Sequence, residues 1–282
     1  MDRWKAELAS ELQLGRIRAA ETLSGGCIHL VERWRCDSQS VVVKSNRQPV
    51  PGIFEAESRG LQALADSQTL RVPQVLAVSE RYLVLEDLGN GIKRNDFDQQ
   101  LGQGLAMLHR LPQSDFGFTC NTFCGSTLQL NPMIQDGWVF FGEYRLCFQA
   151  RLARDNGYID SGLSQRIDAI AQRLAQWIPY QASALIHGDL WSGNVHCCTD
   201  GRPALIDPAA YWGWPEADLA MTRLFGGFGR DFYDAYNEAR PLEPEFEQRI
   251  PLYNLYHLLN HLNLFGGSYL AQVCRIVADF TD

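Results

Sequence analysis

The sequence predicts an α+β protein of two lobes, a small β-rich N-terminal lobe and a larger, mainly helical C-terminal lobe. Three observations carry this prediction. Short strand-like runs with one helical stretch among them occupy the first 88 residues, leucines at helical spacing dominate later, and no long linker or repeat interrupts the chain. With 282 residues, 46% of them apolar, the chain can fill two cores. We expect the lobes at residues 1–88 and 89–282.

The first lobe is predicted to be a sheet with one helix against it. Residues 1 to about 20 begin with alternating charged and apolar side chains, which predicts an amphipathic first helix. A β-hairpin is expected over residues 28–45, where apolar β-prone runs surround a polar turn. Residues 53–64 show helical spacing, and residues 72–76 and 82–85 are short β-prone runs.

The second lobe is predicted to be mainly helical. Residues 98–111 place leucines on one helix face, and residues 138–156, 163–177 and 245–280 are also expected to be helical. Residues 112–137 are rich in Pro, Gly, Ser, Thr and Asn, which predicts a long loop.

Charge and hydropathy exclude some classes of protein. The net charge is −8, with 11 basic and 12 acidic residues over 1–88 but 14 and 21 over 89–282. An acidic second lobe disfavours nucleic acid as a partner and would attract amines, although solubility explains the charge equally simply. No apolar run is long enough for a membrane span, and the N-terminus lacks a secretory signal, so a cytoplasmic protein is expected.

The most informative stretch is residues 185–195, LIHGDLWSGNV, followed by ALID at 204–207. It combines a strand end, His-x-Asp, four residues and Asn with a second short strand that ends in Asp. Kinases need this arrangement, since one carboxylate meets the acceptor hydroxyl while an amide and a second carboxylate hold Mg²⁺ against ATP phosphates. Asp189 is therefore the predicted catalytic base, and Asn194 and Asp207 are the predicted Mg²⁺ ligands.

A lysine at the end of a strand fits the same chemistry. Lys44 follows the apolar run 41–43 and is expected to contact the α- and β-phosphates of ATP. Its partner should be an acid on the next helix. Glu55 and Glu57 both qualify, and Glu57 is preferred because it lies four residues before Leu61 on the inner helix face.

Two further segments are predicted to bind the nucleotide. Gly25 and Gly26 precede the hairpin, where their backbone N–H groups would cover the phosphates, although an ordinary turn would explain them too. Glu86, Asp87 and Leu88 directly follow a strand, at the place of the hinge whose backbone recognises adenine in kinases. A plain linker would have the same placement.

The eight cysteines include no C-x-x-C pair and no histidine at zinc-finger spacing, so reduced thiols are expected. Cys27, in the glycine segment, should be accessible. A redox switch through an intermolecular disulfide is one hypothesis for it, and an inert small residue is the other. The chain is accordingly expected to be a monomer or a redox-dependent dimer.

Nearly the whole chain resembles the fructosamine (ketosamine) kinase family, within the aminoglycoside-phosphotransferase and protein-kinase-like superfamily. The resemblance extends well beyond HGDLWSGN. The other matching segments are GGCI at 25–28, FEAE at 54–57, GST at 125–127, WVFFGEYRL at 138–146, IDPA at 206–209, EADLAMTRLFGGF at 216–228 and HLLNHLNLFG at 257–266.

This resemblance implies an ATP- and Mg²⁺-dependent kinase that phosphorylates a sugar hydroxyl, O3 in the family, of ribulosamine or fructosamine adducts of lysine, free or protein-bound. Phosphate is a better leaving group than hydroxide, so the adduct would decompose and release the amine, which is deglycation. An aminoglycoside- or choline-type kinase is an alternative, disfavoured by residues 257–266. A catalytically inactive ATP-binding regulator is another, disfavoured because all four polar catalytic positions are present.

The resemblance also suggests where the acceptor binds. Trp191 is a candidate platform for the sugar face, or else a core anchor for its loop. His257 and His261 lie at helical spacing and would line the acceptor site unless they are packing residues. Relatives usually carry Tyr-Gly-His where this chain has Trp-Gly-Trp, so Trp214 is a candidate for altered substrate preference. Asp218 is expected to brace the catalytic loop.

Overall fold

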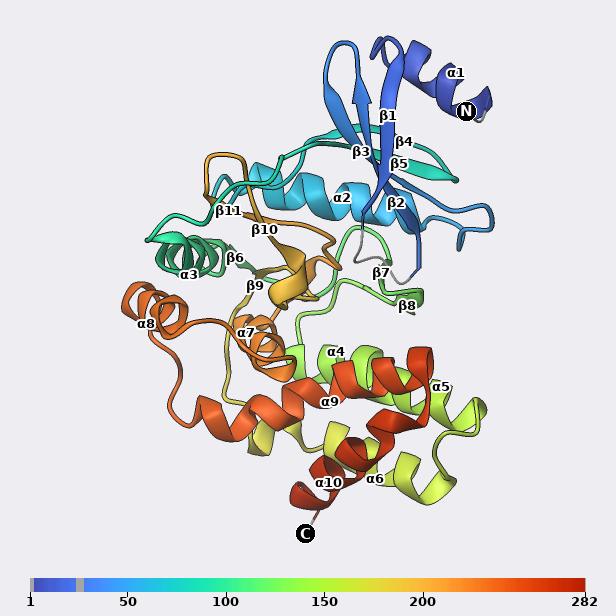
Figure 1. The fold of residues 1–282 in the computed structure, drawn as a ribbon. Coiled ribbons are helices and arrows are strands. Elements are labelled where there is room, and N and C mark those ends of the chain that lie inside the picture. The colour runs from blue at the N-terminus through green and yellow to red at the C-terminus, as the bar shows by residue number, and fades with distance from the viewer. Residues whose placement is uncertain (1–2, 24–27, 282) are drawn as a thin grey trace.

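The structure is a computed structural model that describes residues 3–23 and 28–281. Its N-terminal part is an antiparallel sheet of five strands in the order β1-β2-β3-β5-β4 (Figure 1). The strands are β1 (Ile17–Thr22), β2 (Leu30–Cys36), β3 (Ser40–Ser45), β4 (Val75–Val78) and β5 (Tyr82–Glu86), and the helices are α1 (Arg3–Glu11) and α2 (Ile53–Asp66).

The predicted helix over residues 1–20 is wrong in its second half. Helix α1 ends at Glu11, and Gly15 follows with a φ of 75°, a conformation that suits glycine and ends the helical run. Residues 17–22 then form β1, which pairs with β2. Gly25, Gly26 and Cys27, predicted to lie in a phosphate-binding segment, fall outside the described residues.

Alternation along β3 explains how a lysine reaches the cleft. Val41 and Val43 are fully buried and pack with residues of α1 on one face of the sheet. Val42 and Lys44 therefore point to the opposite face, because successive side chains of a strand alternate. On that face Phe54 and residues of β5 form a second cluster under α2, which holds α2 beside Lys44.

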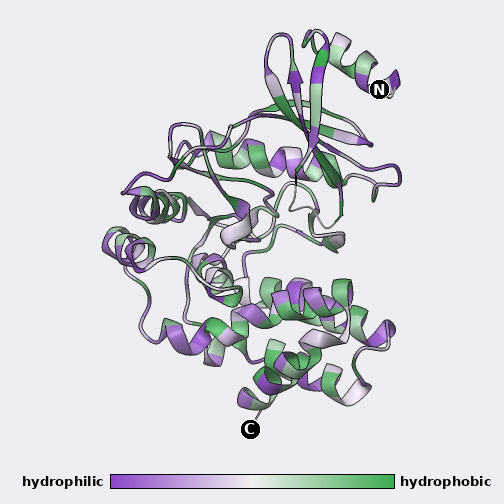
Figure 2. Ribbon diagram, in the orientation of Figure 1, coloured by the Kyte–Doolittle hydropathy of each residue, from purple (hydrophilic) through white to green (hydrophobic). Residues whose placement is uncertain are grey.

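The C-terminal part is mainly helical, and the hydropathy colours alternate along its helices, as expected where one face is buried (Figures 1 and 2). Its helices are α3 (Phe97–Leu108), α4 (Gly137–Phe141), a π-helical turn (Gly142–Cys147), α5 (Phe148–Asp155), α6 (Ser161–Ala171), α7 (Pro215–Leu224), α8 (Arg230–Ala239), α9 (Phe246–Phe265) and α10 (Leu270–Asp279). Short 3₁₀ turns occur at Leu174–Gln176, Ser192–Asn194 and Gly267–Tyr269. None of the described helices has the length and apolar character needed to cross a membrane.

Small sheets connect these helices. The strands are β6 (Pro112–Gln113), β7 (Thr122–Cys124), β8 (Thr127–Gln129), β9 (Ser183–Ile186), β10 (Val195–Cys197), β11 (Pro203–Leu205) and β12 (Tyr211–Gly213). They pair as β12-β9-β6, β10-β11 and β7-β8. The prediction of a loop over 112–137 is thus incomplete, because it missed three strands of two or three residues. Elements that short have no detectable alternation.

A buried ion pair ties α7 to α9. The guanidinium of Arg249 donates to Glu216 at 2.8 and 2.5 Å, and Tyr253 donates to the same carboxylate at 2.9 Å. The Glu216 side chain is 1% exposed and that of Arg249 is 5% exposed. Because α7 also carries Asp218, this pair fixes a helix on which the catalytic loop depends.

Glu216→Gln is expected to lower the free energy of unfolding by about 3–5 kcal/mol, since it leaves the buried Arg249 cation without a carboxylate. Urea denaturation followed by circular dichroism measures the change. Glu247→Gln is the matched control, because Glu247 pairs with Arg223 at the surface and its side chain is 66% exposed. That change should alter stability by less than about 1 kcal/mol. Equal losses in both variants would contradict the expectation.

Candidate active site

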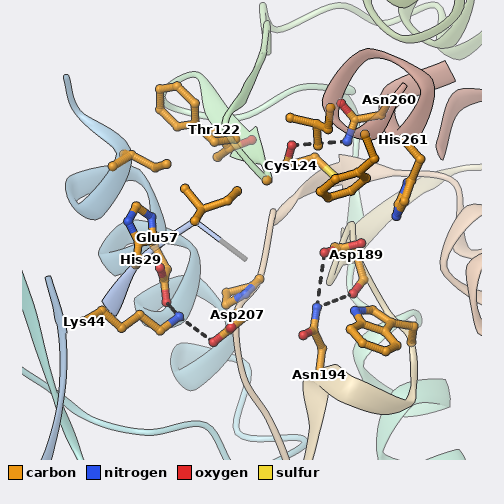
Figure 3. A pocket seen from close by; sticks show the side chains of 18 of the residues that line it. His29, Lys44, Glu57, Thr122, Cys124, Asp189, Asn194, Asp207, Asn260 and His261 are labelled. Atoms are coloured by element: carbon orange, nitrogen blue, oxygen red, sulfur yellow. Dashed lines mark hydrogen bonds and ion pairs between the residues drawn. The ribbon is translucent and has the colours of Figure 1, made fainter. Parts of the chain in front are cut away.

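Two cavities meet between the sheet and the helical part of the chain. The larger, of about 540 Å³, is lined partly by the β7–β8 hairpin and α9, and the smaller, of about 350 Å³, by the segment after β5. Both are lined by Val31, Lys44, Asn194 and Asp207. Asp189 lines only the larger cavity. Lys44, Asn194 and Asp207 therefore lie where the two cavities join, and Asp189 faces the larger one. Figure 3 shows these four side chains around one pocket.

The loop that carries Asp189 is held from below by a buried carboxylate. Asp218 accepts hydrogen bonds from the backbone N–H groups of His187 and Gly188, at 2.6 and 2.8 Å. Burial would raise the pKa of Asp218, but its hydrogen bonds and the nearby His109 hold it below its usual value. Gly188 has a φ of 81°, which lets the chain turn sharply after β9.

His187 braces the loop and does not reach the cleft. Its ring is fully buried, and burial lowers its pKa, so the ring is neutral. Nε2 donates to the backbone carbonyl of Ile206 at 2.9 Å, and Nδ1 accepts from the Asp189 N–H at 3.3 Å. These two contacts join the loop to the segment that ends in Asp207.

Asn194 orients Asp189. Its side-chain nitrogen donates to the Asp189 backbone carbonyl at 2.8 Å and to Oδ2 of the Asp189 carboxylate at 3.2 Å (Figure 3). Burial raises the pKa of Asp189 to about 7, and the negative charge of Asp207 adds to the rise. A carboxylate poised near neutral pH suits a general base.

Lys44 lies between two carboxylates. Its ammonium is 2.5 Å from Oε1 of Glu57 and 2.5 Å from Oδ1 of Asp207 (Figure 3). Burial opposes the charge, but the two carboxylates outweigh it and raise the pKa of Lys44. Glu55 instead pairs with Arg59 at the surface. Of the two acids considered, Glu57 is thus the one that contacts the lysine.

The donor atoms at the junction fit a magnesium ion. Strands β10 and β11 pair Val195 with Leu205, which places Asn194 and Asp207 side by side at one end of the hairpin. The nitrogen of Asn194 is engaged by Asp189, which leaves its oxygen for another partner. Together with the Asp207 carboxylate this provides hard oxygen ligands of the kind that Mg²⁺ prefers.

The predicted hinge lines the smaller cavity, and its acidic side chains are engaged in ion pairs. Glu86 pairs with Arg71 at 2.5 Å, and Asp87 pairs with Arg33 at 2.9 Å. Leu88 is buried and its carbonyl accepts from the backbone of the C-terminal part. The side chains therefore stiffen the segment, and its backbone is the part suited to a nucleotide base.

Two of the four candidate acceptor residues line the larger cavity. Trp191 packs its ring over Gly193 and meets Phe225 edge-on, and His261 donates from Nδ1 to the His257 carbonyl. His257 itself is 4% exposed and lies behind the cavity wall.

Trp214 is not brought to either cavity joined at the cleft. It is 3% exposed at the start of α7 and belongs to an aromatic cluster. Its ring neighbours are Phe116, Trp138, Phe141 and Tyr253. The indole therefore fills the core where a smaller polar ring would leave space, which does not support the expectation of a direct substrate contact.

Several residues that line the larger cavity carry no recognisable signal in the sequence. Thr122 and Cys124 come from the β7–β8 hairpin, inside the stretch whose composition predicts a loop, and His29 comes from the chain just before β2. Only the GST segment beginning at Gly125 marked this hairpin. Gly125 has a φ of 64°, which its tight turn requires.

Glu57→Gln is expected to raise the KM for ATP about tenfold, because Lys44 then keeps only Asp207 as a charged partner and loses its fixed position. Steady-state kinetics with varied ATP measures this. Glu55→Gln, on the same helix but facing solvent, serves as the control and should leave KM unchanged. An equal KM in all three proteins would contradict the role of the ion pair.

Comparison with known proteins places the chain in one family. The profile of the family described as fructosamine kinase matches residues 1–282. A protein named as a probable ketoamine kinase from Synechocystis is 43% identical over 93% of this chain and 90% of its own length. The chloroplastic protein-ribulosamine 3-kinase of Arabidopsis thaliana is 36% identical over 97% of this chain and 86% of its own length.

A solved structure agrees. A Haemophilus somnus protein assigned as a fructosamine-3-kinase superimposes with a TM-score of 0.89 at 26% identity, over 99% of this chain and 98% of that chain. The predicted kinase-like α+β fold, with its β-rich N-terminal and helical C-terminal parts, is confirmed. The chain belongs to the fructosamine kinase family.

Proposed function

We propose that this chain transfers the γ-phosphoryl group of ATP to a sugar hydroxyl, O3, of a ketosamine such as a ribulosamine or fructosamine adduct of lysine. The observation that carries the proposal is the junction of the two cavities. Asp189 lies on the larger one, while Lys44, Asn194 and Asp207 line both. The names of the relatives, ketoamine kinase and protein-ribulosamine 3-kinase, support the acceptor class.

In this proposal residues 1–88 form the nucleotide-binding lobe and residues 89–282 the catalytic lobe. Adenine lies in the smaller cavity against the backbone of residues 86–88, and the phosphates extend toward Lys44 and the glycines at 25 and 26. The acceptor occupies the larger cavity. The enzyme acts in the cytoplasm, without a nucleic acid or membrane partner.

The chemistry follows from these positions. Asp189 accepts the proton of the acceptor hydroxyl while the hydroxyl oxygen forms a bond to the γ-phosphorus of ATP. At the same time the bond between the γ-phosphorus and the β–γ bridging oxygen breaks, and that oxygen leaves with ADP. Lys44 neutralises charge on the phosphates, and Asn194 and Asp207 would hold Mg²⁺, which supplies further neutralisation. The product carries a phosphoryl group in place of the hydroxyl proton and is therefore a phosphate ester. Phosphate leaves more readily than hydroxide, so the adduct then decomposes and frees the amine.

One assay tests the proposal against its alternatives. ATP consumption is measured with ribulose-lysine, fructose-lysine, kanamycin and choline, with Asp189→Asn as the control. Turnover of either sugar adduct, lost in the variant, is expected. Turnover of kanamycin or choline alone would overturn the acceptor class, and bound ATP without turnover of any acceptor would indicate a regulator.

The value of kcat/KM is expected to rise with pH and to level off above about 7, because Asp189 must be ionised to accept a proton and burial raises its pKa to about 7. Below that pH the fraction of ionised base falls about tenfold per unit. Measuring kcat/KM from pH 5 to 9 at constant ionic strength tests this dependence. A flat profile down to pH 5 would contradict the assignment.

A further inference from the structure

A cysteine, a carboxylate and a histidine converge beside the larger cavity. Sγ of Cys124, an oxygen of Asp189 and a ring nitrogen of His257 lie within 4.8 Å of one another. They come from three separate elements, β7, the loop after β9, and α9. Figure 3 shows Cys124 and Asp189 close together at one side of the cavity, away from Lys44.

The cluster contains potential metal-ligand atoms that no hydrogen bond occupies. His257 is 4% exposed, and its Nδ1 atom is buried without a hydrogen-bond partner among the described residues. Asp189 accepts from Asn194 through Oδ2, and within residues 3–23 and 28–281 no side chain donates to its other oxygen. A buried polar atom without a partner is costly, so a histidine with an unpartnered ring nitrogen, packed beside a thiol and a carboxylate, points to a missing ligand.

We propose that Cys124, Asp189 and His257 form a second cation site, selective for a thiophilic divalent ion such as Zn²⁺. Thiolate and imidazole are ligands that Mg²⁺ avoids and Zn²⁺ prefers. Binding requires that the Cys124 thiol lose its proton to solvent. Two anionic ligands and one neutral ring then balance the charge of the ion.

The spacing permits such a site after a small movement. Bonds of about 2.0–2.3 Å around a tetrahedral Zn²⁺ place its ligand atoms about 3.3–3.8 Å apart. Since the three atoms lie within 4.8 Å of one another, they need to approach by at most about 1.5 Å. Three protein ligands leave the fourth position open. Because Cys124 and Asp189 both line the larger cavity, that position faces the space for the acceptor.

The site would act as an inhibitory switch, a consequence that rests on the proposed function. An ion bound to Asp189 occupies the carboxylate that accepts the hydroxyl proton, so phosphoryl transfer stops. The same ion also obstructs the cavity that the acceptor must enter. It leaves the smaller cavity unchanged. Inhibition should therefore be competitive with the acceptor and not with ATP.

The first experiment measures the metal alone, without substrates. Co²⁺ is titrated into the full chain, and the thiolate-to-Co²⁺ charge-transfer absorption is recorded, with Zn²⁺ used to displace it. Cys124→Ala should abolish this absorption, and His257→Gln should weaken binding by more than the 10–100-fold typical of losing a supporting residue. Cys147→Ala is the matched control, because Cys147 is also buried but lies outside the cluster, and it should keep the absorption.

Thermal unfolding checks that each variant is folded, and Cys124→Ser, which preserves the side-chain size, replaces the alanine variant if that one is not. An equal Co²⁺ spectrum in the Cys124 variants and the parent would overturn the site. So would binding unaffected by His257→Gln.

The second experiment asks whether the site inhibits. For each protein the rate with buffered Zn²⁺ is divided by its own rate without Zn²⁺, at saturating MgATP. The parent and Cys147→Ala should lose activity when Zn²⁺ is added and regain it when a chelator removes the ion. Cys124→Ala should keep its activity in the presence of Zn²⁺. Equal inhibition of all proteins would overturn the switch. If no acceptor is turned over, the proposed function fails, while the Co²⁺ spectra still decide the metal site.

Discussion

Replacing Asp189 with Asn is expected to lower kcat by about 10²–10⁴-fold, the contribution typical of a positioned general base. The amide has nearly the shape of the carboxylate, so the hydrogen bonds that orient the loop through Asn194 can persist, but it cannot accept the proton of the acceptor hydroxyl. ATP binding in the smaller cavity should not change, since Asp189 does not line it.

Three measurements separate this loss from misfolding. Steady-state kcat gives the size of the loss, and titration with a non-hydrolysable ATP analogue gives nucleotide affinity. The variant should unfold at no lower temperature than the parent above pH 7, because the folded state holds Asp189 at a raised pKa and its ionisation disfavours folding there. Asp200→Asn, in an exposed turn, is the control. A variant that keeps more than about a tenth of the parent kcat would contradict a general base at this position.

The catalytic loop could be predicted because its functional residues lie close together in the sequence. Asp189 and Asn194 are five positions apart, and Asp207 follows on the next hairpin, so the spacing alone brings the three together. Lys44 could be predicted from its place at the end of a strand. Its contact with Glu57 followed from helix geometry, because residues 57 and 61 lie on one face of α2.

Other parts of the site depend on contacts between distant segments. Cys124 and His257 are 133 positions apart, and neither lies in a pattern that signals proximity to Asp189. The hairpin that carries Cys124 has strands of three residues, too short for a periodic signal. The burial of Trp214 could not be predicted for a related reason. A substitution relative to a family pattern shows that the residue differs, but only packing shows that its ring fills the core.

Replacing Asp207 with Asn is expected to lower kcat by about 10³-fold. The change removes a charged oxygen ligand of the proposed Mg²⁺ and one of the two carboxylates beside Lys44. Together these supply several kcal/mol of transition-state stabilisation, and about 4 kcal/mol corresponds to a thousandfold rate. Asparagine suits the backbone, because Asp207 has a φ of 56°, and Asn is among the few residues that adopt this conformation readily. The loss should therefore reflect charge and not folding.

The magnesium dependence of the rate distinguishes this variant from Asp189→Asn. The Asp207→Asn variant should bind Mg²⁺ more weakly, because one of the two proposed ligands has lost its charge. Its half-maximal activity should therefore require a higher Mg²⁺ concentration than that of the parent. The Asp189 variant should keep the dependence of the parent, because its carboxylate meets the hydroxyl and not the ion. Lys44 still contacts Glu57 in the Asp207 variant, so ATP affinity should fall less than kcat. If both variants showed the same magnesium dependence, the division of roles between the two carboxylates would be wrong.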